Sequence, residues 1–66
     1  MKVYVNDKEV TTKPNISLFE FIVEQGFSTN GTATAINNHV IPKSKQREII
    51  LKENDKIMVI QAVCGG

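Results

Sequence analysis

The chain has 66 residues, of which 41% are hydrophobic and 23% charged, and its formal net charge is +1. These proportions are typical of one globular domain and argue against disorder. A single cysteine cannot close an intramolecular disulfide, and with only one histidine no metal site is expected. The near-neutral charge disfavours binding to nucleic acid, and no apolar run approaches the roughly 20 residues that span a bilayer. Residues 1–5 enter a strand pattern without a signal peptide, which predicts a cytoplasmic location.

Short apolar segments bounded by turn residues predict the strands of a small sheet. A hairpin opens the chain, because two segments of strand-like residues are separated by turn residues at 6–8. A second turn at 37–39 joins two further strands, and a third at 53–55 precedes the longest apolar segment. Segment 48–51 either extends the sheet or packs under it. The predicted strands cover residues 2–5, 9–12, 32–37, 40–41 and 56–63.

One helix is predicted between the hairpin and the later strands. Ser17 and Glu20 have the spacing of a capping box, in which the serine oxygen accepts an amide hydrogen bond and the glutamate reaches back. A wide apolar stripe follows, and Gly26 ends the helix because glycine adopts the left-handed conformation at little cost. The helix should therefore cover residues 17–25.

This order of elements predicts an α+β protein with the β-grasp (ubiquitin-like) fold. A mixed sheet of four to five strands would carry one helix packed on one face. The first and last strands can pair in parallel at its centre, since the helical crossover lies between them. We expect residues 1–63 to form the β-grasp domain and residues 64–66 a flexible C-terminal tail.

The last strand is apolar on both faces, whereas one helix can cover only one of them. The positions expected under the helix are Val3, Val5, Ile57 and Val59. Side chains of the opposite parity would face outward, either as scattered exposed hydrophobics or as one contiguous docking patch. We favour the patch, which would continue into the residues after the strand. The candidate partner-binding residues are Tyr4, Met58, Ile60, Ala62, Val63 and Cys64.

The diglycine Gly65-Gly66, directly after the predicted central strand, is the most informative feature of the sequence. Three residues beyond Val63 reach roughly 10 Å when extended. A glycine carboxylate can enter a narrow channel and approach a nucleotide phosphate closely, because no side chain obstructs it. A frayed end is the simpler alternative. We interpret Gly66 as the reacting residue and Gly65 as the residue that gives the tail access to a partner's channel.

Segment 35–42, the turn at 53–55, the apolar strand and Gly65-Gly66 together resemble the ThiS family, over the whole chain. ThiS proteins are ubiquitin-like sulfur carriers of thiamin biosynthesis. The resemblance implies that a ThiF-like adenylyltransferase uses ATP to convert the Gly66 carboxylate into an acyl-adenylate, while the carrier itself binds no cofactor. A persulfide from a cysteine desulfurase, or from another donor, would displace AMP and leave a thiocarboxylate. A ThiG-like thiazole synthase would take the sulfur, so the chain would be a protein co-substrate and not an enzyme.

Two departures from the family pattern accompany the resemblance. Residues 53–55 read Glu-Asn-Asp where the family often has Asp-Gly-Asp, and asparagine can replace glycine at a left-handed turn position. Residues 43–47 lack the aromatic residue that the family often carries after the proline, which can alter partner fit. Neither departure touches the tail.

Other interpretations remain open at this point. The small subunit of molybdopterin synthase shares the fold, the diglycine and the thiocarboxylate, although that family usually runs longer. A ubiquitin-like modifier that forms isopeptide bonds and a plain interaction domain are further alternatives.

Cys64 precedes the reacting carbonyl, but nothing in the sequence activates its thiol, and we expect it to be dispensable. Lys43, Lys45 and Arg47 are interpreted as a solvated loop, with steering toward an acidic partner as the alternative, and His39 as an exposed turn residue.

Overall fold

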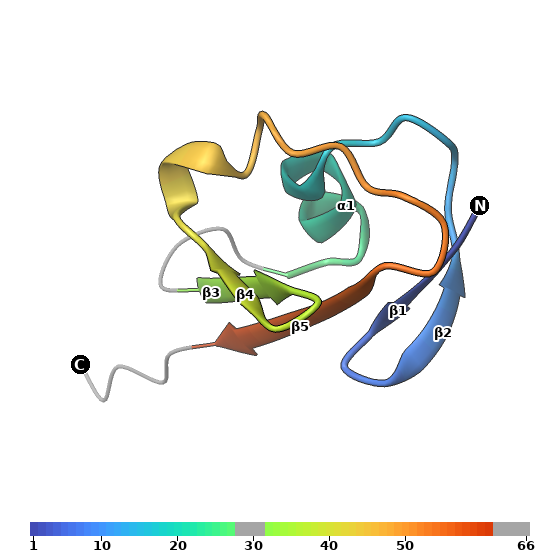
Figure 1. Ribbon diagram of the computed structural model, residues 1–66, viewed down its shortest axis with the longest axis horizontal. Helices are drawn as coiled ribbons and strands as arrows, with labels where there is room; N and C mark the ends of the chain where they lie inside the picture. Colours follow the sequence, from blue (N-terminus) through green and yellow to red (C-terminus); the bar gives the residue numbers. More distant parts are fainter. Residues whose placement is uncertain (28–31, 62–66) are drawn as a thin grey trace.

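A five-stranded mixed sheet carries one helix on one face in the computed structural model, which describes residues 1–27 and 32–61 (Figure 1). The elements are β1 (Lys2–Val5), β2 (Lys8–Thr11), α1 (Leu18–Glu24), β3 (Thr32–Ile36), β4 (His39–Ile41), a 3₁₀ helix (Lys43–Lys45) and β5 (Lys56–Gln61). The strand order is β2-β1-β5-β3-β4, with β5 parallel to β1 and antiparallel to β3. The predicted β-grasp arrangement is confirmed, while the division between domain and tail at residue 63 falls outside the described residues. No helix in the described part of the chain is long and apolar enough to cross a membrane.

The two hairpin turns are tighter than the sequence pattern indicates. Asn6 and Asp7 have φ values of 49° and 69°, and Asn37 and Asn38 have φ values of 50° and 70°. Two successive positive φ values are the pattern of a type I′ turn, whose twist matches that of the flanking strands. Lys8 therefore already belongs to β2, and His39 begins β4 instead of lying in the turn.

The predicted helix and its caps are confirmed. Ser17 is the N-cap, and its Oγ accepts a 3.1 Å hydrogen bond from the amide of Glu20. The Glu20 carboxylate returns to the serine hydroxyl at 3.4 Å, and not to the serine amide as in the usual capping box. Gly26 follows the helix with φ 85°, in the conformation that glycine adopts without steric cost.

Segment 48–51 does not extend the sheet. It pairs instead with the residues before α1, because the amide of Leu18 donates to Ile49 O at 2.8 Å and that of Leu51 to Ile16 O at 2.9 Å. Leu51 is buried in the core beside Ile16. The segment therefore closes the end of the core at the start of the helix.

Gln46 is a buried residue inside a stretch expected to be polar and irregular. It is 2% exposed, its Nε2 donates to Thr34 Oγ1 at 3.0 Å, and its carbonyl accepts from the amide of Phe19 at 3.0 Å. Oε1 has no hydrogen-bond partner among the described residues. Gln46 thus ties the loop after Pro42 to the helix through its backbone carbonyl and to β3 through its side chain.

Two asparagines hold the central strand β5 from its two sides. The backbone amide of Asn6 donates to Ile57 O at 2.9 Å, and its side-chain Oδ1 accepts from the backbone amide of Val59 at 2.9 Å. On the other side the amide of Asn37 donates to Lys56 O at 2.8 Å, and its Oδ1 accepts from the amide of Lys56 at 3.1 Å. Each asparagine therefore forms a hairpin turn and also continues the hydrogen bonding along β5.

The first prediction separates these two roles of Asn6. Asn6→Gly keeps the positive φ but leaves the Val59 amide without its partner, and should cost about 1–3 kcal/mol of unfolding free energy. Asn6→Ala should cost about 1 kcal/mol more, because alanine is also strained at this φ. Asp7→Gly, the control in the same turn, should change stability by less than about 0.5 kcal/mol. Urea unfolding measures all three, and an Asn6→Gly protein as stable as wild type would contradict the role of the side chain.

Candidate functional site

The sheet face opposite α1 carries exposed apolar side chains on β5. Ile57 and Val59 are 2% and 7% exposed in the core beneath the helix, whereas Met58 and Ile60 are 49% and 55% exposed. Tyr4 pairs with Lys56 across the parallel ladder and is half-buried on the same outward face. The alternation of β5 thus supplies two core side chains and an outward apolar strip.

Register extends this strip across two more strands. Directly paired residues present their side chains on the same face. Ala33 pairs with Ile60, and Ala35 pairs with both Met58 on β5 and Val40 on β4. Val40 is 76% exposed. We define the sheet patch as Tyr4, Ala33, Ala35, Val40, Met58 and Ile60.

A shallow hollow continues the sheet patch beyond the start of β5. Ala35 and Met58 belong to both, and Lys56 and the two hairpin turns complete its lining. The side-chain carboxamides of Asn6 and Asn37 already form hydrogen bonds with β5. The hollow therefore offers a partner side chain mainly its shape and the opposite charges of Lys56 and Asp7.

The sheet patch extends to the end of the described part of β5. Ile60 is the penultimate residue of β5, and Gln61 is the last residue that the structure describes. The predicted site residues Ala62, Val63, Cys64, Gly65 and Gly66 lie outside the described residues, so their roles stay predictions. Among the described candidates, Tyr4, Met58 and Ile60 lie together on one face.

Sequence reasoning missed Ala33, Ala35 and Val40. Their membership depends on β3 lying between β5 and β4, which is a matter of strand order. Val40 and Ile41 are both apolar, so alternation within so short a strand did not indicate which of the two faces outward. The structure leaves Val40 exposed and partly buries Ile41.

The basic residues after Pro42 lie on the helix side of the molecule. The Arg47 guanidinium carbon is 4.2 Å from the centroid of the Phe19 ring. Lys45 Nζ is 3.8 Å from Glu48 Oε2, in an exposed pair of the kind that contributes little to stability. The loop is exposed as expected, apart from the buried Gln46, but Arg47 is held against α1 by a contact that the sequence did not indicate.

The comparisons with known proteins decide the family. Residues 1–66 match the sequence model of the ThiS family. The chain belongs to the ThiS family. It is 24% identical over 66 residues to the sulfur carrier protein ThiS of Escherichia coli strain K12, an alignment that covers 100% of both proteins.

Two solved structures share the fold of this ThiS-family chain. The crystal structure of a thiamine biosynthesis protein, ThiS, from Geobacter metallireducens superposes with a TM-score of 0.84 at 17% identity and covers 100% of each chain. The solution structure of a thiamine biosynthesis protein from the same organism gives a TM-score of 0.81 at 17% identity, covering 100% of this chain and 88% of that one. At this identity the likeness establishes the β-grasp fold.

The second prediction tests the face assignment in this ThiS-family chain. Met58→Ser and Ile60→Ser should each change the free energy of unfolding by less than about 1 kcal/mol, because both side chains already contact water. Ile57→Ala on the same strand is the matched control and should cost about 2–5 kcal/mol, because it leaves a cavity in the core. Chemical denaturation distinguishes the two classes, and a Met58→Ser loss as large as that of Ile57→Ala would contradict the assignment.

Proposed function

We propose that the chain is a sulfur carrier of thiamin biosynthesis whose reacting group is the Gly66 carboxylate. The observation that carries the proposal is membership of the ThiS family over residues 1–66. Support comes from the full-length alignment with the Escherichia coli sulfur carrier protein and from the diglycine that follows the central strand. The chain is then a co-substrate of partner enzymes and not itself an enzyme.

Activation of Gly66 requires ATP, which a ThiF-like adenylyltransferase binds and the carrier does not. The carboxylate attacks the α-phosphorus, pyrophosphate leaves, and an acyl-adenylate forms. The terminal sulfur of a donor persulfide then attacks the acyl carbon and AMP departs, which gives an acyl disulfide with the donor cysteine. A thiol supplies the two electrons that cleave this disulfide, and the carrier is released as a thiocarboxylate. A ThiG-like thiazole synthase would use that nucleophilic sulfur.

The sheet patch is the surface that the adenylyltransferase would cover. Ile60 is six residues from Gly66, a reach of roughly 20 Å in an extended chain. A partner seated on the patch therefore holds the carboxylate within range of its own nucleotide site. The same Met58→Ser and Ile60→Ser proteins should bind the adenylyltransferase more weakly, while Lys8→Glu on the edge strand β2 should bind it as wild type does.

The third prediction concerns the position of the carboxylate. A carrier with one residue added after Gly66 should lose ATP–pyrophosphate exchange with the cognate adenylyltransferase, because the added side chain and displaced carboxylate no longer fit the channel. A longer extension that a protease removes back to Gly66 is the control, and exchange should return on cleavage. Equal exchange by the extended and the wild-type carrier would overturn the assignment of Gly66.

The fourth prediction concerns Cys64. Cys64→Ala should form thiocarboxylate as fast as wild type, since a thioester between Cys64 and Gly66 would close a strained small ring and an unactivated thiol is mostly protonated at neutral pH. Intact-mass spectrometry of the reconstituted reaction measures the yield. Loss of thiocarboxylate with pyrophosphate exchange intact would show a covalent step on Cys64.

A further inference from the structure

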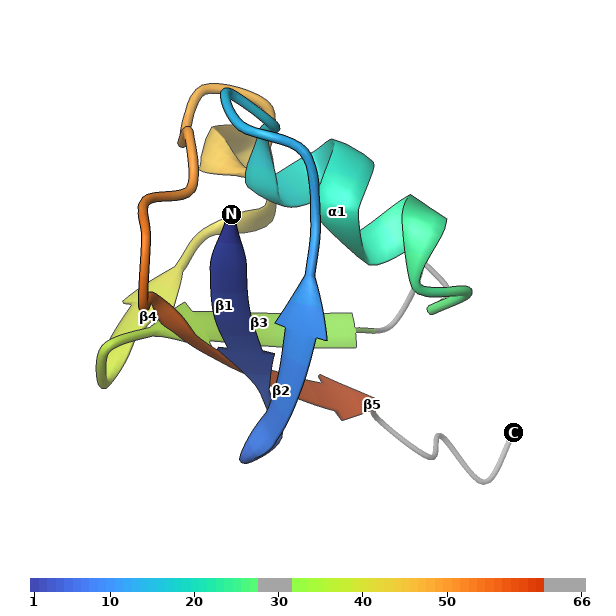
Figure 2. The ribbon, with the colours of Figure 1, turned by 90° about the vertical axis from the view of Figure 1, so that its right-hand side faces the viewer.

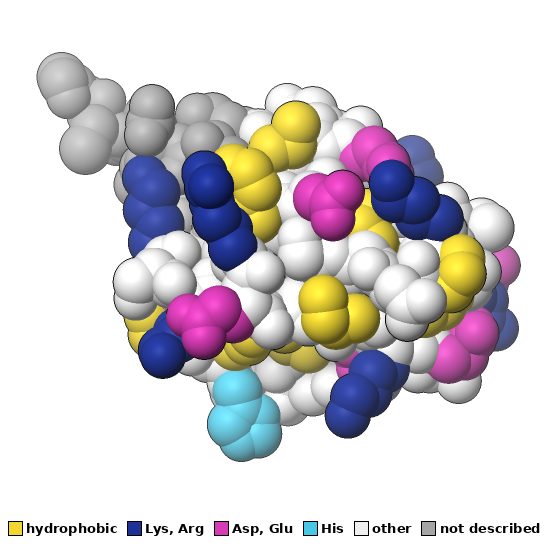
Figure 3. Space-filling view, turned by 90° about the horizontal axis from the view of Figure 1, so that it is seen from above, with side chains coloured by type: hydrophobic (Ala, Val, Ile, Leu, Met, Phe, Trp, Pro, Cys, Tyr) yellow, Lys and Arg dark blue, Asp and Glu magenta, His cyan; other side chains and the backbone are white. Residues whose placement is uncertain are grey.

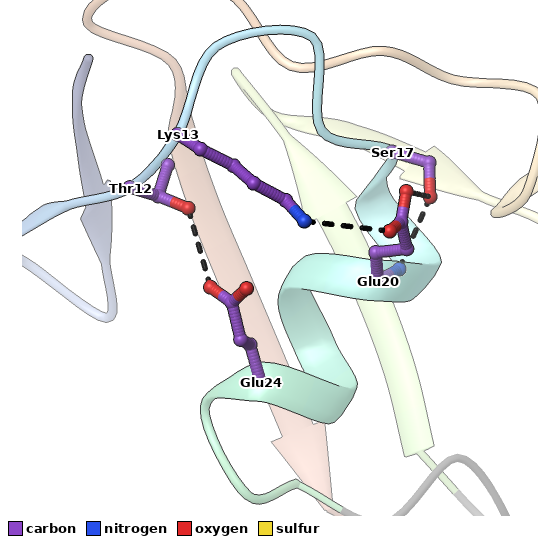
Figure 4. A network of polar contacts seen from close by, with 5 residues as sticks. All are labelled: Thr12, Lys13, Ser17, Glu20 and Glu24. Carbon is purple, nitrogen blue, oxygen red and sulfur yellow. Dashed lines mark hydrogen bonds and ion pairs between the residues drawn. The ribbon is translucent and has the colours of Figure 1, made fainter.

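The two flanks of α1 differ in chemistry. On one flank the Glu20 carboxylate is 3.8 Å from Lys13 Nζ, and Glu24 Oε1 accepts a 3.4 Å hydrogen bond from Thr12 Oγ1 (Figure 4). These contacts join the helix to the segment that leads from β2. The acidic flank is thus engaged within the molecule.

The other flank presents apolar surface beside a held cation. Phe19 and Val23 are one helical turn apart and therefore neighbours on the helix surface. Val23 is 52% exposed, and the Arg47 guanidinium lies over the Phe19 ring. The space-filling view from the helix side shows hydrophobic side chains between basic and acidic ones (Figure 3). We define the Arg47 flank as Phe19, Val23, Lys43, Lys45 and Arg47.

Positive charge is concentrated in the sequence segment that contributes the three basic residues of this flank. Of the eight basic and seven acidic side chains in the chain, four basic and one acidic lie in residues 43–52. That segment has a net charge of +3, and the rest of the chain, with four basic and six acidic side chains, has −2. An acidic partner surface would complement this positive segment, so the charge distribution favours an acidic partner at the Arg47 flank.

The stacked arginine indicates what kind of acidic partner fits. A guanidinium laid flat on a ring keeps its N–H edge free and oriented for bidentate contact with a carboxylate. The same contact covers one face of the Phe19 ring, which reduces the aromatic surface available to a bilayer. The small overall charge disfavours nucleic acid. An acidic protein surface with an apolar side chain for Val23 fits best.

The Arg47 flank can be occupied while the sheet patch is covered. The buried side of α1 packs on the core residues Ile57 and Val59, and the sheet patch lies on the opposite face of the same strands. Figure 2 shows that α1 and β5 end on the same side of the molecule. Val23 is the penultimate residue of α1, so a protein that contacts it lies on the side of the molecule where β5 ends, whereas Arg47 lies against Phe19 near the start of the helix.

We propose that the Arg47 flank docks the protein that delivers sulfur, through carboxylates at Arg47 and an apolar contact at Val23. This inference rests on the proposed function. An acyl-adenylate hydrolyses in water, so the donor has to reach it while the adenylyltransferase still shields the tail. Two proteins cannot cover the same face at once, and the carrier meets this requirement with a second face of opposite orientation.

The test compares two sources of sulfur. Purified carrier, adenylyltransferase, ATP and a thiol reductant are combined either with a cysteine desulfurase and cysteine or with excess sodium sulfide, which displaces AMP directly. The variants are Arg47→Glu and Val23→Ser, and Lys8→Glu is the control with the same kind of charge reversal away from the flank. Pyrophosphate exchange reports adenylation, intact mass reports thiocarboxylate, and an unfolding curve for each variant reports the fold.

With the desulfurase, Arg47→Glu should form thiocarboxylate about tenfold more slowly, equivalent to ~1.4 kcal/mol, and Val23→Ser should be slowed in the same direction. Pyrophosphate exchange and the sulfide-driven rate should match wild type, and added salt should slow only the desulfurase-driven reaction. Rates of Arg47→Glu and Val23→Ser equal to that of Lys8→Glu would overturn the inference. So would loss of pyrophosphate exchange in Arg47→Glu, which would assign the flank to the adenylyltransferase.

Two further outcomes are distinct from these. If wild type sediments with phosphatidylserine vesicles, Arg47→Glu does not, and the desulfurase-driven rates are equal, the flank is a membrane surface and the inference is wrong. If wild type forms no acyl-adenylate, the proposed function itself fails, and the inference fails with it. Pyrophosphate exchange by the folded wild-type carrier shows that the acyl-adenylate forms, and it therefore distinguishes failure of the proposed function from failure of the inference alone.

Discussion

The rest of the structure depends on how β5 is held. It is the central strand, and its neighbours arrive from the two ends of the sequence, β1 in parallel and β3 antiparallel. Asn6 and Asn37 each follow a neighbouring strand, turn the chain with a positive φ, and bond to β5 from its two sides. Because turn conformation and strand pairing use the same residues, neither hairpin can shift its register without releasing the central strand.

The register of β5 also determines which of its side chains face the helix and which face the opposite side of the sheet. A shift of one residue would exchange inward and outward side chains along the strand, burying Met58 and exposing Ile57. In the observed register the inward side chains pack against Phe21 and Ile22 of α1, and the outward ones join β3 and β4 in the sheet patch.

Under the proposed function, the chain has to present one reactive group to several proteins in turn. The chain supports this with chemically different surfaces on the two faces of one sheet. The sheet patch is apolar and extends to the end of the described part of β5, whereas the Arg47 flank combines a guanidinium placed over an aromatic ring with exposed Val23. The buried pair Gln46–Thr34 connects the two sides, because it anchors the basic loop to β3 from within the core.

Local features were determined by the sequence alone: the Ser17 cap, the Gly26 stop, the hairpins and the alternation that separates Ile57 from Met58. Each depends on interactions between residues within one turn or one strand of each other, so a short stretch of sequence is enough to predict it. The central parallel pair of β1 and β5 was predicted from the order of the elements, but the placement of β3 between β5 and β4, which adds Ala33, Ala35 and Val40 to the patch, was decided only by the tertiary structure. So were the burial of Gln46 and the stacking of Arg47 on Phe19, since each joins segments more than ten residues apart whose contact no local propensity encodes.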